Sequence, residues 1–191
     1  MPMACILIGA GGHAKAVAEA AIATIGPIAA YVDPNPCDWL RAEQLNTDAD
    51  VKTNGIPVVI GMGGVATAQL KVRLALLDFY LGRGHPAPAI VHPAAHVSAS
   101  ARLESGAIVL AGAVVQPGAV IGRGVIVNTR AVVEHDSMIG DGGHVAPGAI
   151  VLGGCRVGRC AMIGASAVVL PAAVVDDEML VPALTRHGGK P

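Results

Sequence analysis

The sequence predicts two structural parts, an α/β part with a Rossmann-like βαβ arrangement over residues 1–85 and an all-β parallel β-helix over residues 86–191. Two observations support this division. The first part alternates short apolar runs with a glycine-rich turn and helix-forming segments, a pattern typical of a parallel sheet covered by helices. The second part has an aliphatic residue at every sixth position, a period found in hexapeptide-repeat β-helices but not in α-helices or ordinary strands.

The first part begins with an apolar run at residues 4–8, which predicts a buried strand that ends in the glycine-rich turn. The segment HAKAVAEAAIA, residues 13–23, predicts a helix, and Lys15 and Glu19 have the i,i+4 spacing of an ion pair. The polar segment 33–55 predicts a surface loop with a short helix, in which Trp39 is a packing residue. The other predicted elements are strands at 28–33 and 57–61 and a helix at 65–82.

The turn GAGGHA, residues 9–14, matches the dinucleotide-binding pattern G-x-G-x-x-A, and Asp33 follows Gly9 at about 24 residues, near the fingerprint spacing. A part this short has no room for two mononucleotide-binding halves, so we expect a reduced domain that binds a different nucleotide. The backbone N–H groups at the turn and at the helix start can bind phosphate. A glycine turn without a ligand is the alternative.

The repeat of the second part runs from residue 91 to residue 181. Its aliphatic positions are Val91, Val97, Leu103, Val109, Val115, Ile121, Val127, Val133, Ile139, Val145, Val151, Val157, Ile163, Val169, Val175 and Val181. Four residues after each of them a small residue is usual, as at Ala107 and Ala113. We expect the aliphatic residues to point inward and the small residues to let the chain turn, in roughly five coils of about 18 residues.

The composition argues against several classes of protein. The 13 Lys and Arg against 14 Asp and Glu predict no basic surface for nucleic acid. The longest uncharged stretch, residues 105–122, has Gly and Pro at turn-like intervals, which argues against a membrane span. The N-terminus lacks the basic segment of a signal peptide, and the four cysteines form no Cys-x-x-Cys pair, so we expect free thiols and a cytoplasmic protein.

Residues 132–149, VVEHDSMIGDGGHVAPGA, place titratable side chains in an otherwise apolar segment. His135 lies between Glu134 and Asp136, and a neutral imidazole beside a carboxylate can accept a proton near pH 7. Adjacent residues of a strand point to opposite faces, so the spacing leaves open which acid orients the ring. For His135 and His144 alike, a surface histidine is the alternative interpretation.

GAGGHAK near the N-terminus, followed by NTRAVVEHDSMIGDGGHVAPGA within the hexapeptide coils, resembles the sugar O- and N-acyltransferases of the hexapeptide-repeat type over nearly the whole chain. This family includes sialic acid O-acetyltransferases of the NeuD type and the PglD type that N-acetylates UDP-4-amino-sugars. The resemblance implies a left-handed β-helix, acetyl-CoA as the co-substrate and a nucleotide-linked acceptor.

The resemblance also implies residue roles. His135 matches the general base, Asp136 the acid that raises its basicity, and Asn128 an asparagine beside the base. The nucleotide-sugar pocket is matched by Gly11, Gly12, His13, Asp33, Pro34 and Gly61. The acetyl-CoA site is matched by His144, Gly153, Ala165 and Ala183, and Gly153 is also the candidate backbone donor to the oxyanion. No metal site is implied.

The leading hypothesis is an acetyl-CoA-dependent N-acetyltransferase that acts directly on the 4-amino group of a UDP- or GDP-linked amino-sugar. The alternatives are a sialic-acid-type O-acetyltransferase, a metal-dependent carbonic-anhydrase-like protein with three histidines shared across subunits, and a non-catalytic sugar-nucleotide-binding protein. Because a single prism is a convex rod, a concave site needs neighbouring prisms, and we expect a homotrimer with three sites between subunits.

Overall fold

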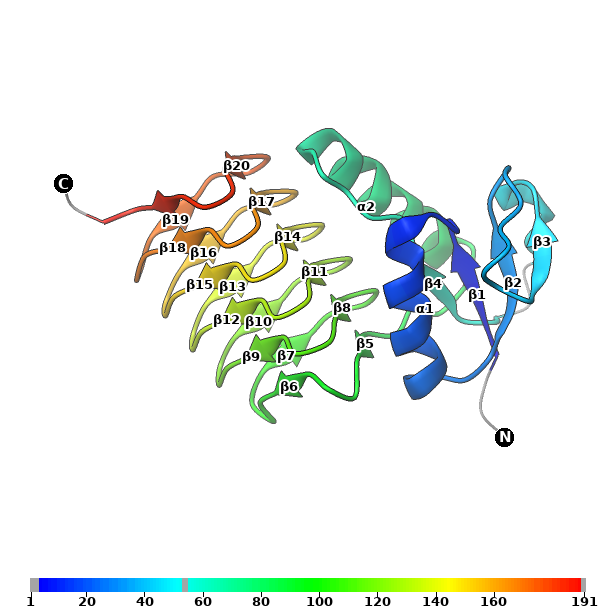
Figure 1. The fold of residues 1–191 in the computed structure, drawn as a ribbon, viewed down its shortest axis with the longest axis horizontal. Coiled ribbons are helices and arrows are strands. Elements are labelled where there is room, and N and C mark those ends of the chain that lie inside the picture. Colours follow the sequence, from blue (N-terminus) through cyan, green and yellow to red (C-terminus); the bar gives the residue numbers. More distant parts are fainter. Residues whose placement is uncertain (1–3, 53–54, 190–191) are drawn as a thin grey trace.

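The structure is a computed structural model that describes residues 4–52 and 55–189. The chain forms a small parallel sheet with two helices and then a three-faced prism of stacked short strands (Figure 1). The predicted fold class, an α/β part followed by a parallel β-helix, is confirmed.

The N-terminal part contains a parallel sheet with strand order β3-β2-β1-β4. Its elements are β1 (Cys5–Ile8), α1 (Gly12–Thr24), β2 (Ile28–Val32), β3 (Glu43–Leu45), the 3-10 helix η1 (Asp48–Asp50), β4 (Val58–Ile60) and α2 (Thr67–Gly82). Both helices and the strands β1, β2 and β4 lie where the sequence predicts them. The sequence did not predict β3, because its residues Glu-Gln-Leu are mostly polar. As the edge strand it pairs with β2 through backbone atoms and needs no apolar face.

The predicted ion pair between Lys15 and Glu19 is replaced by contacts with other segments. Lys15 Nζ lies 6.0 Å from the centre of the Trp39 ring. Glu19 Oε1 lies 3.6 Å from His92 Nε2, at the first coil of the prism. Trp39 packs against the apolar cluster around α1 and donates its Nε1–H to the carbonyl oxygen of Ala10 at 3.1 Å. Lys15 and Glu19 therefore contact distant segments of the chain instead of each other.

Three parallel sheets form the faces of the prism. Face 1 comprises β5 (Ile90–Val91), β8 (Ile108–Val109), β11 (Ile126–Val127), β14 (His144–Val145), β17 (Met162–Ile163) and β20 (Leu180–Val181). Face 2 comprises β6 (His96–Val97), β9 (Val114–Val115), β12 (Val132–Val133), β15 (Ile150–Val151), β18 (Val168–Val169) and β21 (Arg186–His187). Face 3 comprises β7 (Arg102–Leu103), β10 (Val120–Ile121), β13 (Met138–Ile139), β16 (Arg156–Val157) and β19 (Val174–Val175). The chain visits the faces in the order 1, 2, 3, so we name the edges the 1/2, 2/3 and 3/1 corners.

The interior of the prism is built as the six-residue period predicts. The aliphatic residue of each repeat is buried in the described coils from residue 109 onward, and the small residues Ala107, Ala113 and Ala119 point inward beside it. At each corner from residue 106 onward, one residue in six has a positive φ, and glycine occupies many of these positions. The repeat therefore fixes both the narrow core and the sharp corners.

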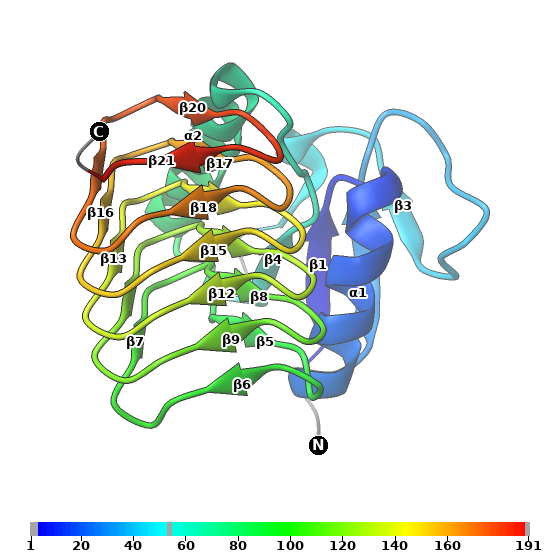
Figure 2. The same ribbon diagram turned by 60° about the vertical axis from the view of Figure 1, so that its left-hand side comes forward.

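The N-terminal part packs on face 1. Ile90, Ile108 and Leu110 belong to the apolar cluster around α1, while Cys160 and Met162 belong to the cluster around α2. Figures 1 and 2 show both helices alongside the prism. Two apolar clusters thus continue from one part into the other, and the proposed boundary after residue 85 falls in the link between α2 and β5.

Two further findings bear on the sequence predictions. All four cysteines, Cys5, Cys37, Cys155 and Cys160, have free thiols. Within the described ranges, no helix combines the length and the apolar character that crossing a membrane requires.

Candidate active site

A pocket of about 730 Å³ lies where the loop after β4 meets the 1/2 corner of the prism. It brings together five residues for which the sequence predicted separate roles: His13, Asn128, His144, Ala165 and Ala183. Its other lining residues are Gly63, Gly64, Val65, Gln69, Ala146, Pro147, Met162, Gly164, Leu180 and Pro182. We call it the 1/2-corner pocket. It is the place where both parts of the chain contribute to one concave surface.

Hydrogen bonds fix the two buried polar side chains of this pocket, His144 and Asn128. His144 Nδ1 lies 2.8 Å from the carbonyl oxygen of Gly64, and since a carbonyl only accepts, Nδ1 carries the proton. The backbone N–H of Thr129 donates to Asn128 Oδ1 at 2.8 Å, which turns the amide NH₂ of Asn128 toward the ring. Asn128 Nδ2 then lies 3.0 Å from His144 Nε2 and donates to its lone pair. His144 is held as one neutral tautomer.

The pocket keeps its histidines neutral. Burial lowers the pKa of His144; its hydrogen bond to Gly64 opposes this shift, and the positive charge of Arg73 adds to it. Burial, assisted by Arg73 and His144, lowers the pKa of His13 to about 4. His13 Nε2 is buried without a hydrogen-bond partner. The pocket therefore presents uncharged imidazoles.

His135 and Asp136 form an exposed pair at the 2/3 corner. His135 Nδ1 lies 2.8 Å from Asp136 Oδ2, so among the two acids beside His135 it is Asp136 that contacts the ring. Asp136 has a φ of 59°, whereas glycine occupies the same corner position in the neighbouring coils, at Gly118 and Gly154. Among non-glycine residues, Asp tolerates this conformation better than most. The left-handed backbone allows the carboxylate to meet the ring of the preceding residue.

Two glycines make room for this pair. A Cβ atom added to Gly153 would lie 2.6 Å from His135 Nε2, and one added to Gly118 would lie 2.6 Å from Asp136 Oδ1. The ring of His135 therefore rests directly on the backbone of the next coil. The predicted role of Gly153 in the acetyl-CoA site stays a prediction, but the structure places this residue next to His135.

Within one chain the two candidate histidines lie at different corners. His135 follows β12 on face 2, His144 lies in β14 on face 1, and β13 on face 3 separates them. Asn128 contacts His144 and not His135, so the asparagine expected beside the base lies beside the other histidine of the same chain. The 1/2-corner pocket of a single chain thus lacks the histidine that is paired with an acid.

The glycine-rich turn is open to solvent at Gly11 and Gly12, and hydrogen bonds to Asp33 hold its backbone in place. The Asp33 carboxylate accepts hydrogen bonds from the backbone N–H groups of Ala10 and Asn35, both at 2.9 Å. Added Cβ atoms at Gly11 or Gly12 would meet no atom within 4 Å. The N-terminus of α1 therefore has space for a ligand.

Gly61 differs from the other predicted substrate residues. It is buried, and an added Cβ would lie 2.5 Å from the carbonyl oxygen of Gly9. Close packing against the turn after β1 is thus enough to require glycine at this position, without any ligand contact.

Adjoining hollows connect the glycine turn with the 1/2-corner pocket. Asp33 and Pro34 line a hollow of about 190 Å³ that borders on Met62. Met62 also lines a hollow of about 250 Å³, which shares Gly63 and Gln69 with the 1/2-corner pocket. Three of the predicted nucleotide-sugar residues, His13, Asp33 and Pro34, therefore line the same series of hollows as His144.

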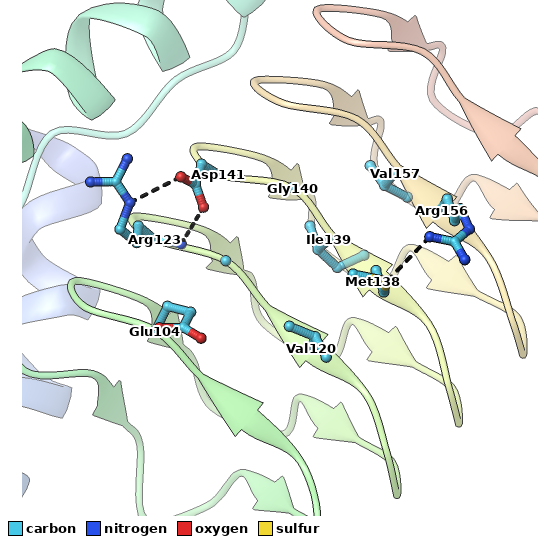
Figure 3. Close-up of a pocket in the computed structure, with 10 residues that line it drawn as sticks. Glu104, Val120, Arg123, Met138, Ile139, Gly140, Asp141, Arg156 and Val157 are labelled. Carbon is cyan, nitrogen blue, oxygen red and sulfur yellow. Dashed lines mark hydrogen bonds and ion pairs between the residues drawn. The ribbon is translucent and has the colours of Figure 1, made fainter.

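A separate groove of about 480 Å³ runs over face 3 and contains none of the predicted site residues (Figure 3). Arg123 lines this groove and forms two ion pairs. Its Nε lies 2.9 Å from Asp141 Oδ2, and its Nη1 lies 2.7 Å from Asp78 Oδ1 on α2. Arg156 points across to Met138, with Nη1 3.5 Å from the Met138 sulfur. Through these ion pairs Arg123 connects α2 with the 3/1 corner of the prism.

Other chemistries find little support among the described residues. Burial raises the pKa of the Cys155 and Cys160 thiols, which disfavours a nucleophilic thiolate. No group of three or more His, Cys, Asp or Glu side chains in the described part of the chain is arranged to hold a metal ion. The three histidines at the entry to the prism have different contacts: His85 Nδ1 lies 3.0 Å from the carbonyl oxygen of Ile56, His92 lies beside Glu19, and His96 is exposed.

The sequence analysis missed Gly64 and Arg73. Gly64 offers no signal, because it acts through its backbone carbonyl. Arg73 does offer one, because it interrupts the apolar stripe that Leu70, Leu74 and Leu77 form on α2. For His144 a similar signal was available: it interrupts the apolar outward column of Ile108, Ile126, Met162 and Leu180 on face 1.

The chain is similar to several solved acetyltransferase structures. The chain is 31% identical to the acetyltransferase domain of PglB from Neisseria gonorrhoeae, solved in complex with acetyl coenzyme A, over 94% of this chain and 88% of that one, with a TM-score of 0.85. It is 30% identical to PerB from Caulobacter crescentus, solved with CoA and GDP-perosamine, over 97% of this chain and 88% of that one, with a TM-score of 0.88. WeeI from Acinetobacter baumannii, at 20% identity, 99% and 98% coverage and a TM-score of 0.74, shares the fold. No protein-family model matches the sequence, and no curated protein does.

The lowered pKa of His13 predicts a loss of stability in acid. Between the ordinary histidine pKa of 6.5 and the folded value of about 4, the unfolded chain binds a proton that the folded protein does not, so the free energy of unfolding falls as pH falls through this window. The largest loss of unfolding free energy that His13 can cause over this window is about 3 kcal/mol, at roughly 1.4 kcal/mol per pH unit. Urea unfolding at pH 7 and pH 4.5 should show that His13→Gln loses less stability than the wild type. His96→Gln, at an exposed strand position, is the control and should behave like the wild type. Equal losses for His13→Gln and the wild type would contradict the assignment.

Proposed function

This chain belongs to the hexapeptide-repeat sugar acyltransferase family and is an acetyl-CoA-dependent sugar N-acetyltransferase, and we propose that its acceptor is the 4-amino group of a UDP- or GDP-linked amino-sugar. One observation carries the proposal: the 1/2-corner pocket unites His13 from the nucleotide-binding turn with Asn128, His144, Ala165 and Ala183 of the prism. A transferase of this kind must place an acceptor and a thioester side by side.

The track of hollows supports a nucleotide-linked acceptor. The open glycine turn at the N-terminus of α1 suits a diphosphate, because helix N-termini offer unpaired N–H groups and a favourable dipole. From there the track leads past Met62 and Gly63 to His144. The sugar would then reach the pocket while the nucleotide stays on the N-terminal part. The similar structure of PerB, which holds CoA and GDP-perosamine, is consistent with such an acceptor.

We propose His135 as the general base. Its Nδ1–H donates to Asp136, which leaves the lone pair of Nε2 to accept the proton of the attacking amine. As the amine nitrogen bonds to the thioester carbonyl carbon and the carbon–sulfur bond breaks, the carboxylate stabilises the imidazolium, which then protonates the departing thiolate. His144 is less suited to this role, because its own lone pair already accepts a hydrogen bond from Asn128.

A trimer would bring His135 to the pocket. Face 2 carries an outward column of half-buried aliphatic residues, Val114, Val132, Ile150 and Val168, and no helix covers it in Figure 2. This column lies between the 1/2 corner with its pocket and the 2/3 corner with His135. If three prisms pack with face 2 toward a three-fold axis, the 2/3 corner of each subunit meets the 1/2 corner of the next. His135 of one subunit then completes the pocket of its neighbour.

The function is tested by thiol release from acetyl-CoA with UDP-, GDP- and CMP-linked sugars as acceptors. We expect release with a UDP- or GDP-linked 4-amino-sugar and none with matched hydroxyl sugars. Gly11→Val should raise KM for the acceptor and leave KM for acetyl-CoA nearly unchanged, because the new side chain has open space within the protein but meets the bound phosphate. Turnover of hydroxyl acceptors alone, or tight binding of NAD, would contradict the proposal.

The base is tested by substitution. His135→Ala should lower kcat by about a hundredfold or more, the usual scale for a lost general base, with modest change in KM. Asp136→Asn should act in the same direction to a smaller extent. Glu134→Gln serves as the matched control for the other neighbouring acid and should retain activity. Near wild-type turnover by His135→Ala would remove this residue from the mechanism.

The shared site is tested by mixing two inactive variants. His135→Ala lacks the base, and Ala165→Trp fills the pocket. After unfolding and refolding together in equal amounts, random trimers should regain about one quarter of wild-type activity, because one site in four combines an intact His135 with an intact pocket from the next subunit. In the control, the double variant mixed equally with wild type should leave about one quarter of the sites active if sites are shared, against about one half if each site lies within one chain. No recovery in the first mixture, or an active monomer, would rule out the shared site.

A further inference from the structure

Arg73, in the middle of α2, is a charged side chain with no solvent exposure. None of the salt bridges among the described residues includes it. Burial lowers its pKa to about 9, which still leaves it protonated at neutral pH. Burying an unpaired guanidinium costs several kcal/mol, so this position calls for an explanation beyond packing.

The hydrogen bonds of Arg73 join three separate segments. Its Nη1 donates to the carbonyl oxygens of Ile60 at 2.7 Å and Met62 at 2.5 Å. Its Nε donates to the carbonyl oxygen of Gly124, on the 3/1 corner of the prism, at 3.2 Å. One side chain of α2 thus ties the end of β4 and the loop after it to the prism.

This loop leads directly to His144. Two residues beyond Met62, the carbonyl oxygen of Gly64 accepts the Nδ1–H of His144. Gly63, between them, packs so closely on His13 that an added Cβ would lie 3.0 Å from the His13 Cβ. A shift of the loop would therefore move both the acceptor for His144 and the support of His13.

We propose that Arg73 is a positioning residue of the acetyl-transfer site, holding loop 61–64 on the prism so that the Gly64 carbonyl keeps His144 in its neutral Nδ1–H tautomer. The kinetic consequences rest on the proposed function, whereas the tautomer rests on the contacts alone. The fixed tautomer matters because it makes His144 Nε2 an acceptor, which in turn orients the amide of Asn128 in the pocket.

The charge of Arg73 supports the same state. The residues that line the 1/2-corner pocket include no Asp, Glu, Lys or Arg, and their titratable side chains are His13 from α1 and His144 itself. Arg73 Nη2 has no hydrogen-bond partner, so nothing in the described structure neutralises the cation. Its field disfavours a second positive charge on either ring.

The test is ¹⁵N NMR of histidine-labelled full-length protein with acetyl-transfer kinetics at pH 6 and pH 8. In the wild type, His144 should show the Nδ1–H tautomer and remain neutral well below pH 6.5. In Arg73→Met we expect a mixture of tautomers, protonation closer to pH 6.5, and a fall in kcat between about tenfold and a hundredfold that is larger at pH 6. Arg73→Lys should restore the resistance to protonation but not the single tautomer. Lys71→Met, which removes an exposed cation from the same helix, is the control and should match the wild type.

The wild-type spectrum alone can overturn the proposal, even if Arg73→Met does not fold. An Nε2–H tautomer, or an ordinary titration of His144 near pH 6.5, would do so. So would a folded Arg73→Met variant with unchanged His144 signals and unchanged kcat. A wild-type protein that shows the fixed tautomer but transfers no acetyl group would instead contradict the proposed function and still support the structural assignment of Arg73.

Discussion

The structure depends on one constraint: an aliphatic side chain must enter the prism at every sixth residue, beside a small residue that lets the chain turn. This requirement leaves the interior almost entirely apolar, as the buried run from Val109 to Val181 shows, although Ser137 is a buried polar side chain. The candidate site residues of the prism therefore lie at the corners and at the outward positions of the strands. His135 and Asp136 occupy a corner, and His144 occupies an outward position.

The faces of the prism differ in whether the N-terminal part covers them, and this difference determines where the candidate site lies. The outward column of face 1 is covered by the N-terminal part, which buries Ile90, Ile108 and Ile126 and, with them, His144. The outward column of face 2 is aliphatic but uncovered. Apolar burial therefore fixes the N-terminal part against one corner, and the proposed trimer would bury the second column in the same way. Both sets of contacts would then bring polar groups to the 1/2 corner.

The two candidate histidines have opposite surroundings. His135 is exposed to solvent, and its Nδ1 lies beside the Asp136 carboxylate. His144 is buried in the 1/2-corner pocket, where burial and the charge of Arg73 disfavour a positive charge on the ring. Under the proposed function, His135 would accept the proton and His144 would be a fixed hydrogen-bonding group, so that burial, charge and tautomer would give one residue type two tasks.

The sequence by itself determined the elements with strong periodicity: the coils, the βαβ start, both helices and the stretch that carries His135. A six-residue repeat and a glycine turn are local patterns, so neighbouring residues are enough to specify them. It could not choose between Glu134 and Asp136, since that depends on the left-handed backbone at residue 136. It also missed the edge strand β3, the partners of Lys15 and Glu19, and Arg73. Only the tertiary structure placed Asn128 beside His144, set His135 on a separate corner and turned the Gly64 carbonyl toward His144. Each of these depends on how distant segments pack against one another, and the spacing of residues along the chain carries no information about that.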